Sequence, residues 1–291
     1  MKLRSKHFVA VACGLSMLSG CSGPRHVVIG SKNFTEQLVL AEIVAQQVER
    51  RLHQTVIRRF DLAGSMLAHQ ALLANEIDLY PEYTGTAFTA ILKHKPLLDP
   101  SMVLGRVRAE YATKGLKWCD PLGFDDSFAM IVRGVDARAS HLVTLSDAER
   151  RPDPWSLGVG YEFLTRADGY RTLMATYPHL RWAGAPKTMD LGLLYRALDQ
   201  GQVTMGAANS TDGLLSILDV KVLQDDRKAF PPYQASIVVR YDSLHQHPGL
   251  DAALAELSGK ISADTMRRLN YEVTGEHRPL HDVAADFLRA E

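Results

Sequence analysis

The stretch from Tyr80 to Thr86 (YPEYTGT) combines side chains that can bind a charged ligand. Its two tyrosines carry π-faces that attract cations, and its carboxylate and hydroxyl groups can bond to polar or charged partners. Tyrosine pairs in soluble proteins are more often half-buried packing residues, so the alternative is that both rings belong to the core.

Motifs of the common enzyme classes are absent from the sequence. It contains no GxSxG nucleophile motif, no P-loop and no HExxH zinc motif. Adjacent carboxylates such as Asp125 and Asp126 would point to opposite faces of a strand, so they do not suggest an acid/base pair. Two histidine pairs lie in loop-like stretches beside prolines; they are His245 with His247, and His277 with His281. We therefore predict no enzyme, no metal site and no cofactor.

The first residues have the layout of an export signal. Three basic residues precede a short apolar run that ends in Leu18-Ser19-Gly20-Cys21. This tetrapeptide resembles the bacterial lipobox, so residues 1–20 are predicted to be a lipoprotein signal peptide, Cys21 the lipidated residue and residues 21–25 a tether. The alternative is a plain secretory signal. Cys13 would leave with the signal and Cys21 would be acylated, so Cys119 is the one free cysteine expected in the mature chain and no internal disulfide can form.

Charge excludes one class of partner. The chain has 33 basic and 33 acidic residues, and loss of three basic ones with the signal leaves the mature protein acidic by three charges. Nucleic acid is therefore not expected as a partner. The predicted location is the periplasm or the outer surface of the plasma membrane, with the membrane reached through the lipid.

The first half of the chain alternates strand and helix patterns, which predicts a parallel α/β sheet. Strands are expected at 26–30, 55–62 and 77–80, and helices at 33–52 and 65–75. Asn33 and Glu36 are spaced as a capping box at the start of the first helix. Lys32 and the YPEYTGT stretch then follow two parallel strands, at the edge of the sheet where ligands bind.

The second half repeats this organisation. A strand is expected at 127–133, an α/β series follows to residue 208, and a similar strand at 236–240 precedes C-terminal helices. Two long strands that bracket an α/β block predict two lobes joined by two crossings, near residues 125 and 230. We place lobe 1 at 26–124 and 230–291, and lobe 2 at 125–229.

Five motifs together resemble one family, the glycine betaine, carnitine and choline binding proteins of osmoprotectant ABC importers. They are IGSKNFTEQ (29–37), EIDLYPEYTGTA (76–87), LTRADGY (164–170), STDG (210–213) and FPPYQASIVVR (230–240). The resemblance implies a two-lobed periplasmic binding protein clamp of type II. It also implies a monomer that takes a betaine-like ligand and delivers it to an ABC permease and its ATPase.

The same resemblance assigns roles to matching positions. Lys32, Thr86 and Arg166 would hold a ligand carboxylate, and Tyr83 and Tyr233 would form walls of an aromatic cage around a quaternary ammonium. Tyr80 would pack behind the site, and Asn33 is a possible additional contact. The alternatives are a solvated loop position for Lys32, a helix-capping hydroxyl for Thr86 and a surface ion pair with Asp168 for Arg166.

Two positions depart from the family pattern. Phe128 stands where a cage tyrosine is usual, and Asn209 replaces another cage aromatic. Loss of one wall implies about tenfold weaker binding of a quaternary ammonium. The alternative is a different ligand, such as carnitine or ergothioneine, whose extra polar group uses the Asn209 amide. Asp125 or Asp126 pairing with the cation would favour choline. A hydrolase acting on a choline or betaine derivative, and a sensory or adhesion module, are the alternatives from other classes.

Overall fold

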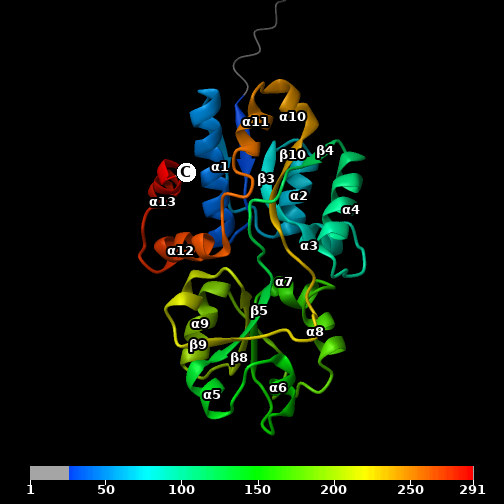
Figure 1. Ribbon diagram of the computed structural model, residues 1–291, viewed down its shortest axis with the longest axis vertical. Helices are drawn as coiled ribbons and strands as arrows, with labels where there is room; N and C mark the ends of the chain where they lie inside the picture. Colours follow the sequence, from blue (N-terminus) through cyan, green and yellow to red (C-terminus); the bar gives the residue numbers. More distant parts are fainter. Residues whose placement is uncertain (1–25, 291) are drawn as a thin grey trace, which may run out of the picture.

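Two five-stranded sheets organise residues 26–290, the part of the chain that this computed structural model describes (Figure 1). The sheet of lobe 1 has the order β2 (Val56–Arg59), β1 (Val27–Gly30), β3 (Leu79–Tyr83), β10 (Ala235–Arg240) and β4 (Leu116–Trp118). The sheet of lobe 2 has the order β7 (Lys187–Thr188), β6 (Leu157–Val159), β8 (Met205–Asn209), β5 (Phe128–Arg133) and β9 (Val220–Leu223). The predicted α/β class and two-lobed organisation are confirmed.

Strand pairing in lobe 1 follows the predicted β-α-β-α-β order. β1 is parallel to both β2 and β3, whereas β10 is antiparallel to β3 and β4. The expected third strand was wrong in its bounds, because β3 continues through Tyr83 and both tyrosines lie inside it. Pro81 is tolerated there because β1 ends at Gly30, so that Ile29 opposite Leu79 is the sole registered pair between β1 and β3.

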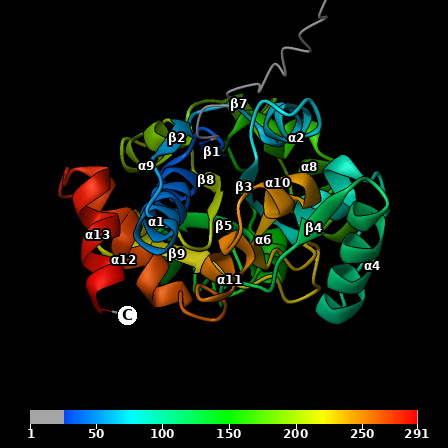
Figure 2. The same ribbon diagram turned by 90° about the horizontal axis from the view of Figure 1, so that it is seen from above.

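Helices cover both faces of the lobe 1 sheet. Figure 2 shows α1 and α13 on one side and α4 on the opposite side. The apolar stripe of α1 is buried at Ile43, Val44 and Val48, which are each at most 1% exposed. The helices of this lobe are α1 (Thr35–Leu52), α2 (Ser65–Leu73), α3 (Thr84–Thr86), the π-helix η1 (Ala87–Ile91), α4 (Pro100–Ala112), α10 (Tyr241–Gln246), α11 (Leu250–Ala255), α12 (Ala263–Thr274) and α13 (Leu280–Ala290).

Lobe 2 is smaller. Its Trp155 and Leu157 belong to an apolar cluster that continues into lobe 1, whereas Leu194 belongs to a separate cluster of lobe 2 residues. Trp155 and Trp182 form one isolated parallel bridge beside the sheet of this lobe. The helices of lobe 2 are α5 (Gly134–Ala139), α6 (Leu145–Arg150), α7 (Tyr161–Thr165), α8 (Tyr170–Thr176), α9 (Leu191–Asp199) and the 3₁₀-helix η2 (Gly213–Ser216).

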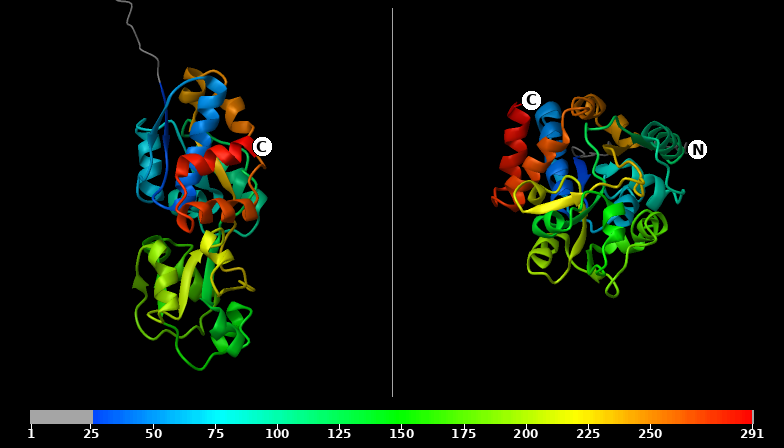
Figure 3. Two further views of the ribbon diagram at one scale, coloured as in Figure 1. Left: turned by 90° about the vertical axis from the view of Figure 1, so that its left-hand side faces the viewer. Right: turned by 60° about the horizontal axis from the view of Figure 1, so that its bottom comes forward.

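Two crossing segments join the lobes and lie side by side. Asp125 and Gln234 form an antiparallel bridge. The Asp126 amide donates to the Tyr233 carbonyl at 3.1 Å, and the Ala235 amide donates to the Phe124 carbonyl at 3.1 Å. Figure 3 shows the lobes one above the other, with the C-terminal helix α13 on lobe 1. Chain segments near both predicted crossing points thus form one short two-stranded ribbon.

None of the helices within residues 26–290 has the length and hydrophobicity needed to cross a membrane. The predicted signal peptide, the lipidated Cys21 and the tether lie outside the described residues. Cys119 is buried and unpaired.

Candidate ligand-binding site

Most of the predicted site residues meet where the two lobes face each other. Lys32 follows β1, Tyr83 ends β3, Phe128 begins β5, and Tyr233 lies on the second crossing. Arg166 joins them from the segment between α7 and α8. Asn33 differs from the rest, because the residue is exposed and its backbone amide donates to the Ala63 carbonyl at 3.0 Å.

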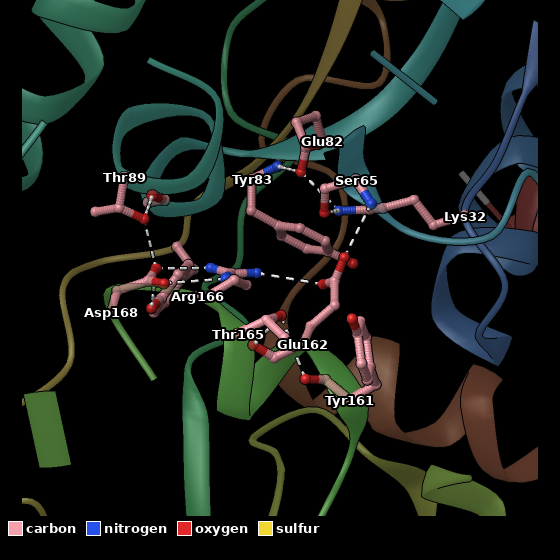
Figure 4. A network of polar contacts seen from close by, with 12 residues as sticks. Lys32, Ser65, Glu82, Tyr83, Thr89, Tyr161, Glu162, Thr165, Arg166 and Asp168 are labelled. Atoms are coloured by element: carbon pink, nitrogen blue, oxygen red, sulfur yellow. Dashed lines mark hydrogen bonds and ion pairs between the residues drawn. The ribbon is translucent and has the colours of Figure 1, made fainter. Parts of the chain in front are cut away.

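Lys32 is buried and ion-paired in lobe 1. Its Nζ lies 2.6 Å from Glu82 Oε1 and 3.4 Å from Ser65 Oγ, and its side chain is 3% exposed. The solvated-loop alternative for Lys32 is therefore wrong. The same Nζ lies 4.5 Å from the centre of the Tyr83 ring, so the lysine ammonium covers one face of that ring (Figure 4).

Glu82 holds Lys32 in place and is itself fixed by the strand. Its Oε1 accepts the Tyr83 amide at 2.7 Å, and its Oε2 accepts the Tyr80 hydroxyl at 3.2 Å. Tyr80 is fully buried. It thus packs behind the site, in the position expected for it, and its hydroxyl orients the carboxylate that neutralises Lys32.

Arg166 forms a buried ion pair rather than the surface pair considered from the sequence. Its Nε and Nη2 donate to the two oxygens of Asp168 at 3.0 and 2.6 Å, and Asp168 is fully buried. Glu162 Oε2 lies 3.5 Å from Nη1. Burial disfavours the ionised form of Asp168, but its bonds to Arg166 outweigh this and lower the pKa of Asp168.

Asp168 also connects the two lobes. Its Oδ2 accepts the Thr89 hydroxyl of lobe 1 at 2.6 Å and the Tyr233 hydroxyl at 2.7 Å. Nearby, the Ser65 amide of lobe 1 donates to Glu162 Oε1 of lobe 2 at 3.0 Å. Figure 4 shows Thr89 and Arg166 converging on the Asp168 carboxylate. These bonds hold the lobes together around the site.

Glu36 forms a second polar centre between the lobes. Its Oε1 accepts the Tyr83 hydroxyl at 2.6 Å. Its Oε2 accepts the Thr211 hydroxyl of lobe 2 at 2.5 Å and the Asn270 amide of α12 at 3.1 Å. The predicted capping box is wrong, because α1 starts at Thr35 and its N-cap, Phe34, makes no side-chain capping bond.

Phe128 lies in a cluster of aromatic rings. Its ring centre is 4.9 Å from Phe163, 5.5 Å from Phe230 and 5.6 Å from Tyr233. The Arg166 guanidinium lies 5.2 Å from the centre of the Phe128 ring and 5.5 Å from that of Tyr233. An aromatic face is thus kept at position 128, although the tyrosine hydroxyl is missing.

Asn209 is the direct neighbour of Phe128. The two residues are paired in register across antiparallel strands β5 and β8, so their side chains share one face of the sheet. Asn209 is half-buried, and its side-chain amide makes no hydrogen bond to any other residue in the described range 26–290. The amide is therefore available to a ligand.

Thr86 lies in α3, next to Tyr83 in space. It is 1% exposed, and within residues 26–290 its hydroxyl has no hydrogen-bond partner. The capping alternative for Thr86 is wrong, since Thr86 directly precedes η1 but its side chain makes no capping hydrogen bond. A buried hydroxyl without an internal partner is suited to donate to a bound group.

Asp125 and Asp126 face different surroundings, as expected for neighbours in an extended segment. Asp125 Oδ2 accepts the Tyr233 amide at 2.6 Å, and the residue lines a surface cavity with Pro121, Phe124 and Gln234. Asp126 Oδ1 lies 3.4 Å from the Thr211 amide, on the side of Glu36.

Sequence reasoning missed several residues that build this site. Glu36, Thr89 and Thr211 were not proposed, and Asp168 was considered only as a surface partner of Arg166. Their contacts join segments far apart in the chain, and Glu36 and Thr211 are 175 positions apart. The useful signal was the position of Glu36 and Thr211 inside two of the family motifs, SKNFTEQ and STDG. Among the described residues no three His, Cys, Asp or Glu side chains form a metal-type cluster.

Comparison with known families decides what kind of protein this is. Residues 25–290 match the OpuAC family model, described as the substrate binding domain of an ABC-type glycine betaine transport system. The chain belongs to this family. The predicted family resemblance is thereby confirmed.

Curated relatives agree with the family. The chain is 31% identical over 281 residues to the carnitine transport binding protein OpuCC of Listeria monocytogenes, covering 96% of this chain and 90% of that one. It is 30% identical over 290 residues to a glycine-betaine-binding protein of Pseudomonas aeruginosa, covering 97% and 93%. It is 33% identical over 267 residues to the ergothioneine transport permease/ergothioneine binding protein EgtU of Helicobacter pylori. That match covers 90% of this chain and 47% of EgtU, so the chain spans about half the length of that relative.

Solved structures confirm the fold. A glycine betaine/carnitine/choline ABC transporter structure superposes with a TM-score of 0.77 at 31% identity, covering 91% of this chain and 98% of that one. The lactococcal OpuAC structure closed on glycine betaine has a TM-score of 0.65 at 12% identity, covering 91% and 96%, and shows the fold alone. As a member of this family, the chain is an extracytoplasmic substrate-binding protein of the class that serves ABC-type glycine betaine transport systems. It is a transport protein that works with an ABC permease, not an enzyme.

Proposed function

We propose that this protein is a lipid-anchored receptor that holds a quaternary-ammonium zwitterion between its lobes. Glycine betaine is the simplest ligand of this kind. The protein would act as a monomer and deliver the ligand to a permease driven by an ATPase, with lobe closure as the signal. Lys32, Tyr83, Thr86, Phe128, Arg166, Asn209 and Tyr233 are the proposed ligand-binding residues, with Asn33, Asp125 and Asp126 as possible additions.

The arrangement of cations over aromatic rings carries this proposal. Lys32 Nζ lies over Tyr83 at 4.5 Å, and the Arg166 guanidinium lies over Phe128 and Tyr233 at 5.2 and 5.5 Å. Three rings at the lobe junction therefore already offer their faces to positive charge. A quaternary ammonium cannot donate hydrogen bonds, so such faces are the main means of recognising it.

Donors for a carboxylate are present beside the rings. A lysine ammonium has three donors, and Lys32 uses one on Glu82 and one on Ser65. Arg166 bonds to Asp168 through Nε and Nη2 and lies near Glu162 through Nη1. With the unpaired hydroxyl of Thr86, these groups support a ligand that carries a carboxylate as well as an ammonium.

Choline, carnitine and ergothioneine are the competing ligands. Asn209 supplies an unpaired amide in place of an aromatic wall, which favours a ligand with an additional polar group. EgtU and OpuCC are relatives whose names give ergothioneine and carnitine as ligands. Choline lacks a carboxylate, so it would leave the donors of Lys32 and Thr86 without a ligand partner.

Calorimetry with a panel of ligands tests the proposal. The panel contains glycine betaine, carnitine, proline betaine, ergothioneine and choline, titrated into the purified protein. We expect saturable binding of at least one zwitterion, with choline weaker. Absence of binding to all five would refute the proposal. If choline bound most tightly, the ligand would be a simple cation and not a zwitterion.

The lipid anchor has a separate test. Cys21→Ser removes the proposed acylation site, and Cys119→Ser is the matched control because that thiol is buried in lobe 1. In cells fed a labelled fatty acid, we expect label and membrane attachment for the wild type and the control, and neither for Cys21→Ser. Label retained in Cys21→Ser would show that Cys21 is not the anchor.

A further inference from the structure

Two buried acidic side chains lie close to each other between the lobes. Glu36 is 3% exposed and Asp126 is 8% exposed. Thr211 connects them, because its hydroxyl donates to Glu36 Oε2 at 2.5 Å and its amide lies 3.4 Å from Asp126 Oδ1. Tyr83, the proposed cage wall, bonds to Glu36 through its hydroxyl at 2.6 Å. The acidic pair therefore adjoins the proposed site.

The acidic pair lacks a basic partner. Among residues 26–290, no Lys, Arg or His forms an ion pair with Glu36 or Asp126. The two cations of the site are already paired, Lys32 with Glu82 and Arg166 with Asp168. Buried charges are normally paired, so this arrangement leaves negative charge to be balanced by something else.

The neighbouring carboxylate of Asp125 does not belong to this acidic pair. Its oxygen is bonded to the Tyr233 amide, and it lines a surface cavity on the outer side of the crossing. Asp126 points the other way, toward Thr211 and Glu36. Of the two aspartates considered from the sequence, Asp126 is thus the one placed to meet a ligand.

Burial raises the pKa of both acids, and the negative charge of Glu36 raises the pKa of Asp126 further. The bonds from Thr211, Tyr83 and Asn270, and the more distant charge of Lys32, act on Glu36 in the opposite direction. Asp125 adds a further negative charge near Asp126. The other ionisable groups facing the acidic pair are two tyrosines, Tyr83 of β3 and Tyr195 of α9.

We propose that Glu36 and Asp126 provide the counter-charge for the ligand's ammonium group, and that binding this group releases a proton held by the acidic pair. The proposal rests on the proposed function, since it concerns the same site. The proton leaves a carboxyl group for solvent while the ammonium takes its place as the positive partner. Asp126 thereby determines specificity, because its charge favours ligands with a cationic group at the place where Asn209 stands instead of an aromatic cage residue.

Proton binding and ligand binding at the acidic pair oppose each other. A cation near the acidic pair stabilises the ionised carboxylates and lowers their proton affinity. Binding therefore competes with protons, and affinity rises with pH until the acidic pair is ionised in the free protein. A ligand held by rings alone would show no such dependence, because a quaternary ammonium does not titrate.

Calorimetry at several pH values tests this proposal. Choline chloride and glycine betaine are titrated into the wild type, Asp126→Asn and the control Asp242→Asn, an exposed aspartate of α10 outside the proposed site, between about pH 5 and about pH 8. Each titration is repeated in two buffers of different ionisation enthalpy, which gives the number of protons released. We expect proton release and affinity rising with pH for the wild type and the control.

Asp126→Asn should weaken both probes by about tenfold or more at the upper pH, and most of the pH dependence should disappear. Equal affinity of Asp126→Asn and the wild type, or binding without proton release, would overturn the acidic-pair proposal while leaving the proposed function standing. If neither probe nor any other of the panel binds at any pH, both proposals fail. A near-UV circular dichroism spectrum like that of the wild type confirms that a weakened variant is folded.

Discussion

The hydroxyl of Thr89 in lobe 1 donates a hydrogen bond to the carboxylate of Asp168 in lobe 2, with the two oxygens 2.6 Å apart. The same carboxylate fixes the guanidinium of Arg166. One acidic side chain therefore both orients a proposed ligand donor and contacts the opposite lobe. Ligand affinity should depend on residues that never touch the ligand, because they decide how easily the lobes close.

Thr89→Val tests the contribution of this bond to closure. The change keeps the shape of the side chain but removes the donor to Asp168. Hydrogen bonds to charged groups contribute about 1.5 to 3 kcal/mol, so we expect ligand affinity to fall by about tenfold or more. Calorimetry measures it. Thr165→Val is the control, since that exposed hydroxyl bonds only within α7 and its loss should leave affinity unchanged.

Asn209→Tyr tests the missing cage wall. Position 209 stands directly beside Phe128 on one face of the sheet, so a ring there joins the existing aromatic cluster. We expect about tenfold tighter binding of glycine betaine. Asn209→Leu is the matched control, because it adds apolar volume without a π-face. Equal gains from both changes, or no gain from tyrosine, would show that Asn209 is not a missing wall.

Lys32→Met tests the buried ion pair. The change leaves Glu82, which is fully buried, without its cationic partner. We expect the free energy of unfolding in urea to fall by about 3 to 5 kcal/mol. Adding Glu82→Gln removes the unpaired charge, so the double variant should recover most of this loss. If the double variant is no more stable than Lys32→Met, the cost arises from packing rather than from charge.

His69 should make the protein less stable in acid. Burial lowers the pKa of His69 from 6.5 to about 4, with a smaller contribution from Lys114. Below about pH 6.5 His69 binds a proton in the unfolded chain but not in the folded protein. The free energy of unfolding therefore falls as the pH drops toward 4. The shift corresponds to up to about 3 kcal/mol.

The matching variant is His69→Phe, which keeps an aromatic ring against Tyr111 but cannot titrate. Urea unfolding at several pH values should give a flatter profile for the variant than for the wild type in this range. Parallel profiles would mean that His69 is not the group responsible.

Local patterns predicted the sheet of lobe 1 well. The apolar period of α1 and the alternation of strands and helices are short-range features, and β1, β2 and β3 are parallel as expected. The end of β3 was missed because its last residues are held by β10, which pairs Ala235 with Tyr83 from a distant part of the chain. No local pattern around Pro81 signals that partner.

The site was predicted in part for the same reason. Lys32, Arg166 and Tyr233 were assigned to the site through family motifs. Glu82 was not recognised as the partner of Lys32, and Asp168 was considered only as a surface partner of Arg166. Glu36 looked like a helix cap because Asn33 precedes it by three residues. Its actual partner, Thr211, becomes a neighbour only when the second lobe docks against the first. The role of Glu36 therefore depends on tertiary contacts that sequence spacing does not contain.

The bridge between Asp125 and Gln234 has a mechanical consequence. Two separate linkers would let the lobes bend, twist and slide independently. Two segments bonded to each other act as one hinge, which bends about one axis and resists twisting and sliding. The lobes can then differ mainly by a single angle of opening. A membrane partner that contacts both lobes would distinguish the ligand-bound form from the ligand-free form by this angle, without contacting the ligand.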